Sequence, residues 1–122
     1  MAYKILCVDD DQINIKVMQK RLEEKGYEVL IALDGEAGLQ RAVSDQPHLI
    51  ILDVEMPKMD GYQFMMQRNK NKALVNTPVI VLTAHEEMQP IFEMKGVKDY
   101  LVKPINFDIL FEKMKVYLPA KE

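Results

Sequence analysis

The chain has 122 residues, 48% of them hydrophobic, and a formal net charge of −3 at neutral pH. This length can bury the core of one domain, which we assign to residues 1–122, and leaves little room for a second. The weak negative charge argues against direct binding of nucleic acid, and the lack of an apolar stretch of ~18 residues argues against a membrane-spanning helix.

The first half of the chain alternates short apolar runs with amphipathic segments. Residues 5–8 have the pattern of a strand buried on both faces, and the run ends in Asp9-Asp10-Asp11. A strand is also expected at 27–32, followed by a helix from the N-cap Asp34 to about residue 46. Between these strands we expect a helix at about 12–25, stopped by Gly26, with an apolar face made of Ile13, Val17, Met18 and Leu22.

The second half of the chain repeats this alternation. A strand at 49–53 ends in Asp53, and Asp60-Gly61 opens a helix that runs to about residue 71. A fourth strand is expected at 79–83, followed by a short helix around 90–94 that ends at Gly96. A fifth strand follows at about 99–102, and Asn106 is the expected N-cap of a last helix that runs to about residue 117.

Strand and helix therefore alternate five times in a single (βα)5 unit. Because right-handed crossovers place helices on both faces of a parallel sheet, we predict an α/β fold with one doubly wound parallel sheet. Such sheets carry their functional groups at the carboxyl ends of the strands, near the point where the strand order reverses. The polar residues at these predicted strand ends are Asp9, Asp10, Asp53, Thr83 and Lys103.

These residue types suit the transfer of a phosphoryl group. Carboxylates at neighbouring strand ends repel one another unless a cation lies between them, and Mg²⁺ typically binds one or two carboxylates together with water and phosphate oxygens. Asp10 and Asp53 can ligate such an ion directly, with Asp9 bound through water. A carboxylate can also act as a nucleophile and form an aspartyl phosphate. Lys103 supplies a compact positive charge and Thr83 a hydroxyl donor.

Four stretches of the chain end at or surround these polar residues: Ile5-Leu6-Cys7-Val8-Asp9-Asp10-Asp11, Leu52-Asp53-Val54-Glu55-Met56-Pro57-Lys58-Met59-Asp60-Gly61, Val81-Leu82-Thr83-Ala84 and Asp99-Tyr100-Leu101-Val102-Lys103-Pro104. In this order they resemble the receiver domains of two-component response regulators. The resemblance covers residues from about 3 to 118. It implies a flavodoxin-like fold with strand order 2-1-3-4-5. It also implies a signalling protein that is not a turnover enzyme, with a sensor histidine kinase or phosphotransfer protein as donor and a downstream protein as target.

The resemblance assigns the chemical roles in the site. Asp53 would receive a phosphoryl group from a histidine of the partner kinase, and Lys103 would pair with that group. Asp10, Asp53 and the backbone carbonyl of Glu55 would hold Mg²⁺, with Asp9 helping through water.

The resemblance also implies a switch and two tuning positions. Thr83 would move toward the phosphoryl oxygens, and Tyr100 would turn inward as the switch aromatic. Glu55 and His85 would tune how fast water removes the phosphoryl group. The Lys103-Pro104 bond would be cis, a state that X-Pro bonds tolerate.

Several alternatives stay open at this point. Asp11 can be an N-cap of the first helix rather than a further ligand, and Tyr100 can be an ordinary strand aromatic. The stretch between Thr83 and Lys103 is about two residues shorter than is usual in the family and contains Pro90, which leaves the fourth helix in doubt. One cysteine and no apolar leader core favour a cytoplasmic protein. Because Met1 immediately precedes the first strand and no linker is present, we expect a stand-alone regulator rather than an excised receiver.

The alternative function is an aspartate-dependent phosphatase of the haloacid dehalogenase type. Asp9 and Asp11 have that family's D-x-D spacing. However, Ile13 stands where a Thr or Val is expected, and no acidic pair follows a strand after Lys103. A flavin-binding module of the same fold fits less well, because its first loop should be rich in Ser, Thr and Gly, whereas here it is acidic.

Overall fold

The fold is a five-stranded parallel sheet in the order β2-β1-β3-β4-β5. It is taken from a computed structural model that describes residues 2–56, 59–84 and 96–118. The sheet confirms the predicted doubly wound topology, and the strand bounds agree with the predicted ones to within one residue. The strands are β1 (Lys4–Val8), β2 (Glu28–Ala32), β3 (Leu49–Asp53), β4 (Val79–Thr83) and β5 (Asp99–Val102).

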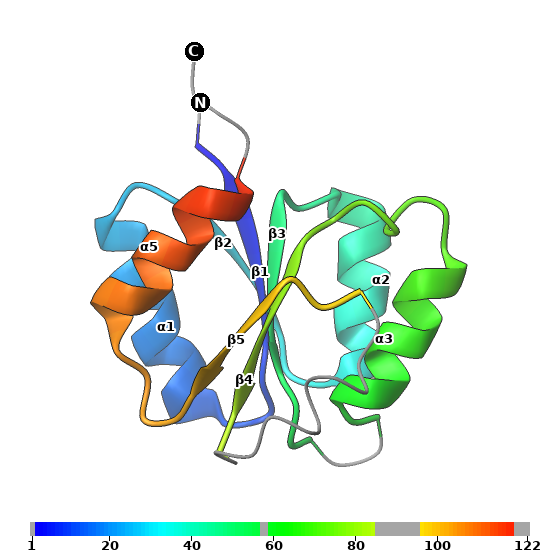
Figure 1. Cartoon of the computed structure of the whole chain (residues 1–122), viewed down its shortest axis with the longest axis horizontal. Helices are drawn as coiled ribbons and strands as arrows, with labels where there is room; N and C mark the ends of the chain where they lie inside the picture. Colours follow the sequence, from blue (N-terminus) through cyan, green and yellow to red (C-terminus); the bar gives the residue numbers. More distant parts are fainter. Residues whose placement is uncertain (1, 57–58, 85–95, 119–122) are drawn as a thin grey trace.

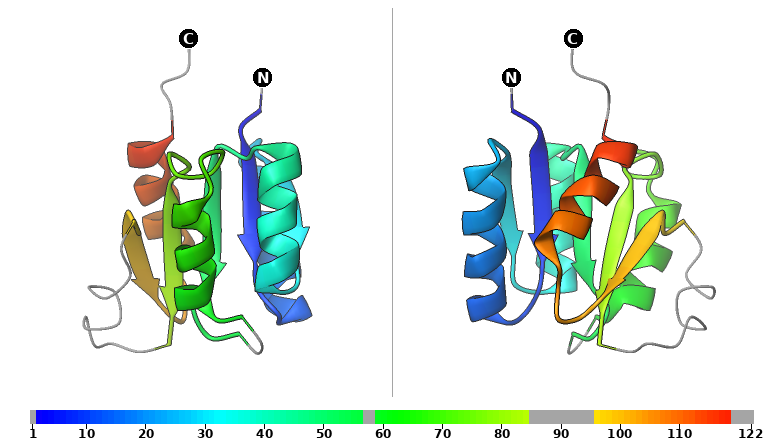
Figure 2. Two further views of the ribbon diagram at one scale, coloured as in Figure 1. Left: turned by 90° about the vertical axis from the view of Figure 1, so that its right-hand side faces the viewer. Right: turned by 60° about the vertical axis from the view of Figure 1, so that its left-hand side comes forward.

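Helices cover both faces of this sheet (Figures 1 and 2). α1 (Gln12–Glu24) and α5 (Phe107–Tyr117) pack on one face, and α2 (Gly35–Asp45) and α3 (Gly61–Lys70) pack on the other. The predicted N-caps are confirmed, because Asp34 accepts from Ala37 N, Asn106 accepts from Ile109 N, and Asp60 forms a capping box with Gln63. The expected fourth helix, with Pro90, lies outside the described residues.

Side chains on the strands alternate between two cores. Ile5 and Cys7 contact the core under α1 and α5, whereas Leu6 and Val8 contact the core under α2 and α3. Every residue of β3 and β4 is buried. Strands covered on both faces must be apolar throughout, which explains why these runs were recognisable in the sequence.

The apolar face of α1 differs from the predicted one. Met18 and Leu22 are buried as expected, but Ile13 is 75% exposed and Val17 is 48% exposed, and Ile15 is buried in their place. The helical period of 3.6 residues puts Ile15, Met18 and Leu22 on one stripe. Ile13 and Val17 each stand two residues from Ile15, which is about 200° around the axis, so they point away from the sheet.

The two ends of the described chain lie at the same end of the molecule. The chain enters β1 and leaves α5 at the edge opposite the carboxyl ends of the strands (Figures 1 and 2). α5 is tied to β5 near that edge, where Lys113 Nζ lies 2.9 Å from Asp99 Oδ1 and the Tyr117 hydroxyl donates to the Lys98 carbonyl. Among the described residues no helix is both long and apolar enough to span a membrane.

Candidate functional site

Three carboxylates meet at the carboxyl edge of the sheet. β1 and β3 pair in parallel, with Val8 opposite Leu52, so the residues that follow Val8 lie beside Asp53. Carboxylate oxygens of Asp9, Asp10 and Asp53 all lie within 4.8 Å of one another. Asp9 and Asp53 are buried, and Asp10 is exposed. The structure therefore brings together the three carboxylates that the sequence placed at these strand ends.

The electrostatics of this cluster favour a cation. Burial and, after it, the neighbouring Asp53 raise the pKa of Asp9 to about 6, against the opposing effect of the Asp11 N–H, which donates to Asp9 Oδ1 at 2.9 Å. A bound divalent cation would relieve the repulsion between the carboxylates. Carboxylate oxygens are the ligands that Mg²⁺ prefers, so the donor set fits this ion.

Lys103 reaches the same cluster from the loop that follows β5. Its Nζ lies 3.1 Å from Asp53 Oδ1. Burial lowers the pKa of Lys103, but the hydrogen bond and the charge of Asp53 outweigh this effect, and the net pKa is raised. Lys103 is held by its backbone N–H, which donates to the Thr83 carbonyl at 2.7 Å, and the bond from Lys103 to Pro104 is cis, as the resemblance implied. A positive charge is thus fixed beside Asp53.

Thr83 ends β4 next to the cluster and is 1% exposed. Its hydroxyl donates to Glu55 Oε1 at 3.1 Å, and the N–H of Ala84 donates to the same oxygen at 3.0 Å. The Glu55 N–H in turn donates to Asp53 Oδ1 at 3.1 Å. From the sequence, Glu55 was expected to contribute only its backbone carbonyl and a tuning position, and its side-chain contact with β4 was not predicted.

The remaining predicted residues take different positions. Asp11 caps α1, with Oδ1 accepting from Ile13 N at 2.9 Å and Asn14 N at 3.2 Å, which confirms its predicted role as an N-cap. Tyr100 stands opposite Val81 in the pairing of β4 and β5 and packs against the core under α2 and α3. Side chains alternate along β4, so Thr83 faces the same side of the sheet as Val81 and Tyr100. His85 lies outside the described residues.

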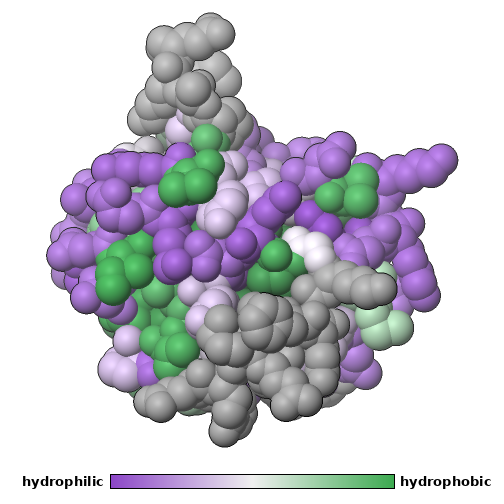
Figure 3. Space-filling model, viewed as in Figure 1, coloured by the Kyte–Doolittle hydropathy of each residue, from purple (hydrophilic) through white to green (hydrophobic). Residues whose placement is uncertain are grey.

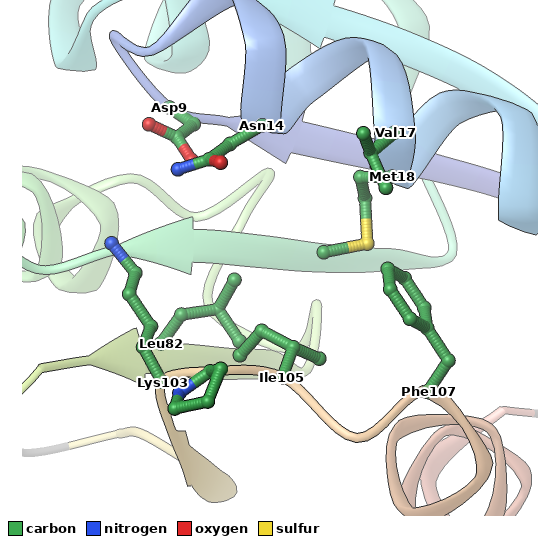
Figure 4. Close-up of a pocket in the computed structure, with 9 residues that line it drawn as sticks. Asp9, Asn14, Val17, Met18, Leu82, Lys103, Ile105 and Phe107 are labelled. Carbon is green, nitrogen blue, oxygen red and sulfur yellow. The ribbon is translucent and has the colours of Figure 1, made fainter.

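A pocket of about 450 Å³ adjoins the site between α1 and the loop after β5 (Figure 4). Asp9 and Lys103 stand at one end of it, and the apolar side chains of Val17, Met18 and Phe107 line the other. The pocket therefore offers an apolar surface that ends in charged groups beside Asp53.

Comparison with known proteins identifies the family. A family model described as the response regulator receiver domain matches residues 5–115. The alkaline phosphatase synthesis transcriptional regulatory protein PhoP of Bacillus subtilis is 36% identical over 124 residues, a match that covers 100% of this chain and 51% of PhoP. The chain thus spans about half the length of this relative.

Solved structures agree with this match. The chemotaxis protein CheY4 of Vibrio cholerae has a TM-score of 0.91 and 32% identity, and the match covers 97% of this chain and 100% of that one. The response regulator protein TrrA of Thermotoga maritima, in complex with Mg²⁺-BeF, has a TM-score of 0.86 and 35% identity, with the same coverage. The phosphatase alternative is not supported by these matches, and Asp11 of its D-x-D spacing is a helix cap. The chain belongs to the response regulator receiver family of two-component signalling.

Proposed function

We propose that Asp53 is the phosphoacceptor of this receiver domain and takes its phosphoryl group from a phosphohistidine of a sensor histidine kinase or phosphotransfer protein. The observation that carries the proposal is the position of Asp53, which lies among the carboxylates of Asp9 and Asp10 and 3.1 Å from Lys103 Nζ. A carboxylate placed beside a fixed cation and a metal-binding set is suited to accept an anionic group.

The transfer is a displacement at phosphorus. A carboxylate oxygen of Asp53 attacks, a P–O bond forms as the P–N bond to the donor histidine breaks, and the electron pair of that bond stays on the imidazole nitrogen. Asp9, Asp10, Asp53 and the backbone carbonyl of Glu55 would hold Mg²⁺, which when bound neutralises charge on the phosphoryl oxygens. Lys103 positions Asp53 and offers its ammonium to the transferred group.

The modified domain would act as a stoichiometric switch rather than as a turnover enzyme. Thr83 would move toward the phosphoryl oxygens, and Tyr100, on the same side of the sheet, would follow it inward. The signal would pass to a downstream protein through the surface around β5 and α5. The net charge of −3 supports a protein rather than nucleic acid as the direct partner of this domain.

The phosphodonor protein would approach beside the pocket between α1 and the loop after β5. That pocket opens next to Lys103 and Asp9, and Val17 at its rim is 48% exposed. A donor that reaches Asp53 from this side can cover apolar surface at the same time. We also propose that residues 1–122 act as a single receiver unit in a cytoplasmic pathway.

Labelling with a small phosphodonor tests the acceptor assignment. Acetyl phosphate with Mg²⁺ should add one phosphoryl group to the wild-type chain. It should add none to the Asp53→Asn variant. Removal of Mg²⁺ with a chelator should also abolish the label, because an anionic donor cannot approach three carboxylates without a cation. Intact-mass spectrometry measures each case. Equal labelling of the wild type and of Asp53→Asn would disprove the assignment.

A further inference from the structure

The Glu55 carboxylate occupies the donor groups that line the acceptor. Glu55 stands two residues after Asp53, and its side chain crosses to the end of β4, where Oε1 accepts from the Thr83 hydroxyl and the Ala84 N–H at 3.1 Å and 3.0 Å. Its Oε2 lies 4.0 Å from Lys103 Nζ. One carboxylate thus contacts a hydroxyl, a backbone amide and an ammonium group at once.

The same three donors face the proposed acceptor. Asp53 is paired with Leu82, so Thr83 and Ala84 follow directly beside it at the sheet edge, and Lys103 contacts it. Phosphoryl oxygens are held by hydroxyl, backbone N–H and ammonium donors of this kind. Two anions cannot share these donors without strong repulsion, so a phosphoryl group on Asp53 has to displace the Glu55 carboxylate.

We propose that Glu55 is a positioning residue that holds Thr83 and Ala84 in the unmodified domain and competes with the phosphoryl group for them. This inference rests on the proposed function of Asp53. The side chain of Glu55 is 35% exposed, so it can leave for solvent when it is displaced, whereas Thr83 is 1% exposed and has to move within the protein. Glu55 therefore opposes activation until the phosphoryl group replaces it.

Beryllofluoride with saturating Mg²⁺ provides a probe that needs no kinase. Glu55→Ala should bind it about tenfold more tightly than the wild type, the effect expected when one charge-assisted competitor is removed. Glu55→Asp keeps the charge but is one methylene shorter and cannot reach Ala84, so its affinity should approach that of Glu55→Ala. Glu55→Gln, which keeps neutral acceptor bonds, should fall between Glu55→Ala and the wild type. Glu112→Gln, on the exposed surface of α5, removes the same charge elsewhere and should match the wild type.

A second readout is independent of metal and probe. In the unmodified protein, hydrogen exchange at the Ala84 amide should become about tenfold faster in Glu55→Ala than in the wild type, because a charge-assisted bond is lost. Unchanged exchange at Ala84 would overturn the contact. If Glu55→Asp binds the probe like the wild type while Glu55→Ala binds more tightly, the negative charge at residue 55 alone weakens binding. Competition for the Thr83 and Ala84 donors would then be disproved.

Asp53→Asn separates this inference from the proposed function. It should lose beryllofluoride binding while the Ala84 amide stays protected by Glu55. If Asp53→Asn binds the probe as well as the wild type, the acceptor assignment is wrong. If Asp53→Asn loses binding but Glu55→Ala, Glu55→Asp and the wild type share one affinity, the role of Glu55 alone is wrong.

Discussion

At the scale of single residues, Asp9 connects the chemistry of the site to the stability of the fold. Its carboxyl group is buried beside Asp53, and burial followed by the charge of Asp53 raises its pKa from the ordinary 3.8 to about 6. The ionised form is therefore disfavoured in the folded, metal-free domain. In the unfolded chain the same carboxyl group ionises near its ordinary pKa.

The stability of the metal-free domain should consequently fall as the pH rises from about 4 to about 6. In that window the unfolded chain releases the Asp9 proton while the folded chain retains it, so rising pH favours unfolding. Asp9→Asn keeps an acceptor for the Asp11 N–H but cannot ionise. The stability of this variant should therefore fall less than that of the wild type over the same pH range. Urea unfolding followed by circular dichroism, with a chelator present, measures both proteins, since the chain has no tryptophan.

Mg²⁺ provides the control for this prediction. At pH 7 the ion should stabilise the wild type by binding only the folded state, and it should stabilise Asp9→Asn less. Parallel pH profiles for the wild type and Asp9→Asn without metal would show that Asp9 is not the group responsible.

At the scale of the secondary-structure elements, α1 shows how one helix divides its apolar residues. Ile15, Met18 and Leu22 face the sheet and are buried. Ile13 and Val17 are exposed, and Val17 also lines the pocket. The buried stripe holds α1 against β1 and β2. Val17 is therefore available to a partner protein that approaches the pocket beside Asp9 and Lys103.

This division predicts opposite outcomes for two substitutions in α1. Leu22→Ala should lower the free energy of unfolding by about 2–5 kcal/mol, because it leaves a cavity at a fully buried position. Ile13→Ala should change it by less than about 0.5 kcal/mol, because that side chain is largely in water. Urea denaturation measures both. Comparable losses for the two variants would contradict the observed orientation of the helix.

The same helix shows what the sequence could and could not predict. Asp11 could be assigned as a cap because capping depends on the next three residues, which are local. The strands that end in Asp53 and Thr83 could be found because double-sided burial requires unbroken apolar runs. The hydrogen bond from Thr83 to Glu55 could not be predicted, because it joins residues 28 positions apart in the chain and depends on the side-chain conformation of Glu55. Ile13 was misassigned because apolar character alone does not tell which side of a helix meets the sheet.

At the scale of the whole molecule, β4 and β5 connect the site to α5. The Lys103 N–H donates to the Thr83 carbonyl at 2.7 Å, and Asp99 in β5 holds Lys113 of α5 at 2.9 Å. If Thr83 moves as proposed, these contacts would carry its displacement along β5 to α5. β2 stands at the opposite edge of the sheet, separated from β4 by two strands.

Binding of beryllofluoride with Mg²⁺ should accordingly change hydrogen exchange at residues 99–102 and 107–117 while it leaves residues 28–32 unaltered. Thr83→Ala should still bind the probe but lose the changes in β5 and α5, because the moving hydroxyl is gone. Exchange measured by mass spectrometry on proteolytic fragments resolves these segments. Changes confined to the acidic loops, or equal changes in β2, would rule out this route.

Some apolar side chains of the described residues are left on the surface. On the face drawn in Figure 3 they appear as separate patches between polar residues. Isolated apolar residues of this kind are usual on soluble domains. A partner that binds this face would therefore meet a mixed surface of apolar and polar groups.

The position of the chain ends has a practical consequence. Because the chain enters β1 and leaves α5 at the edge opposite the acidic cluster, a reporter or tether joined at either end starts away from Asp53. Immobilised molecules would then expose the edge that carries Asp53 to the solution. In surface-based measurements of phosphodonor binding, a link at either of these ends should therefore leave Asp53 accessible to the donor.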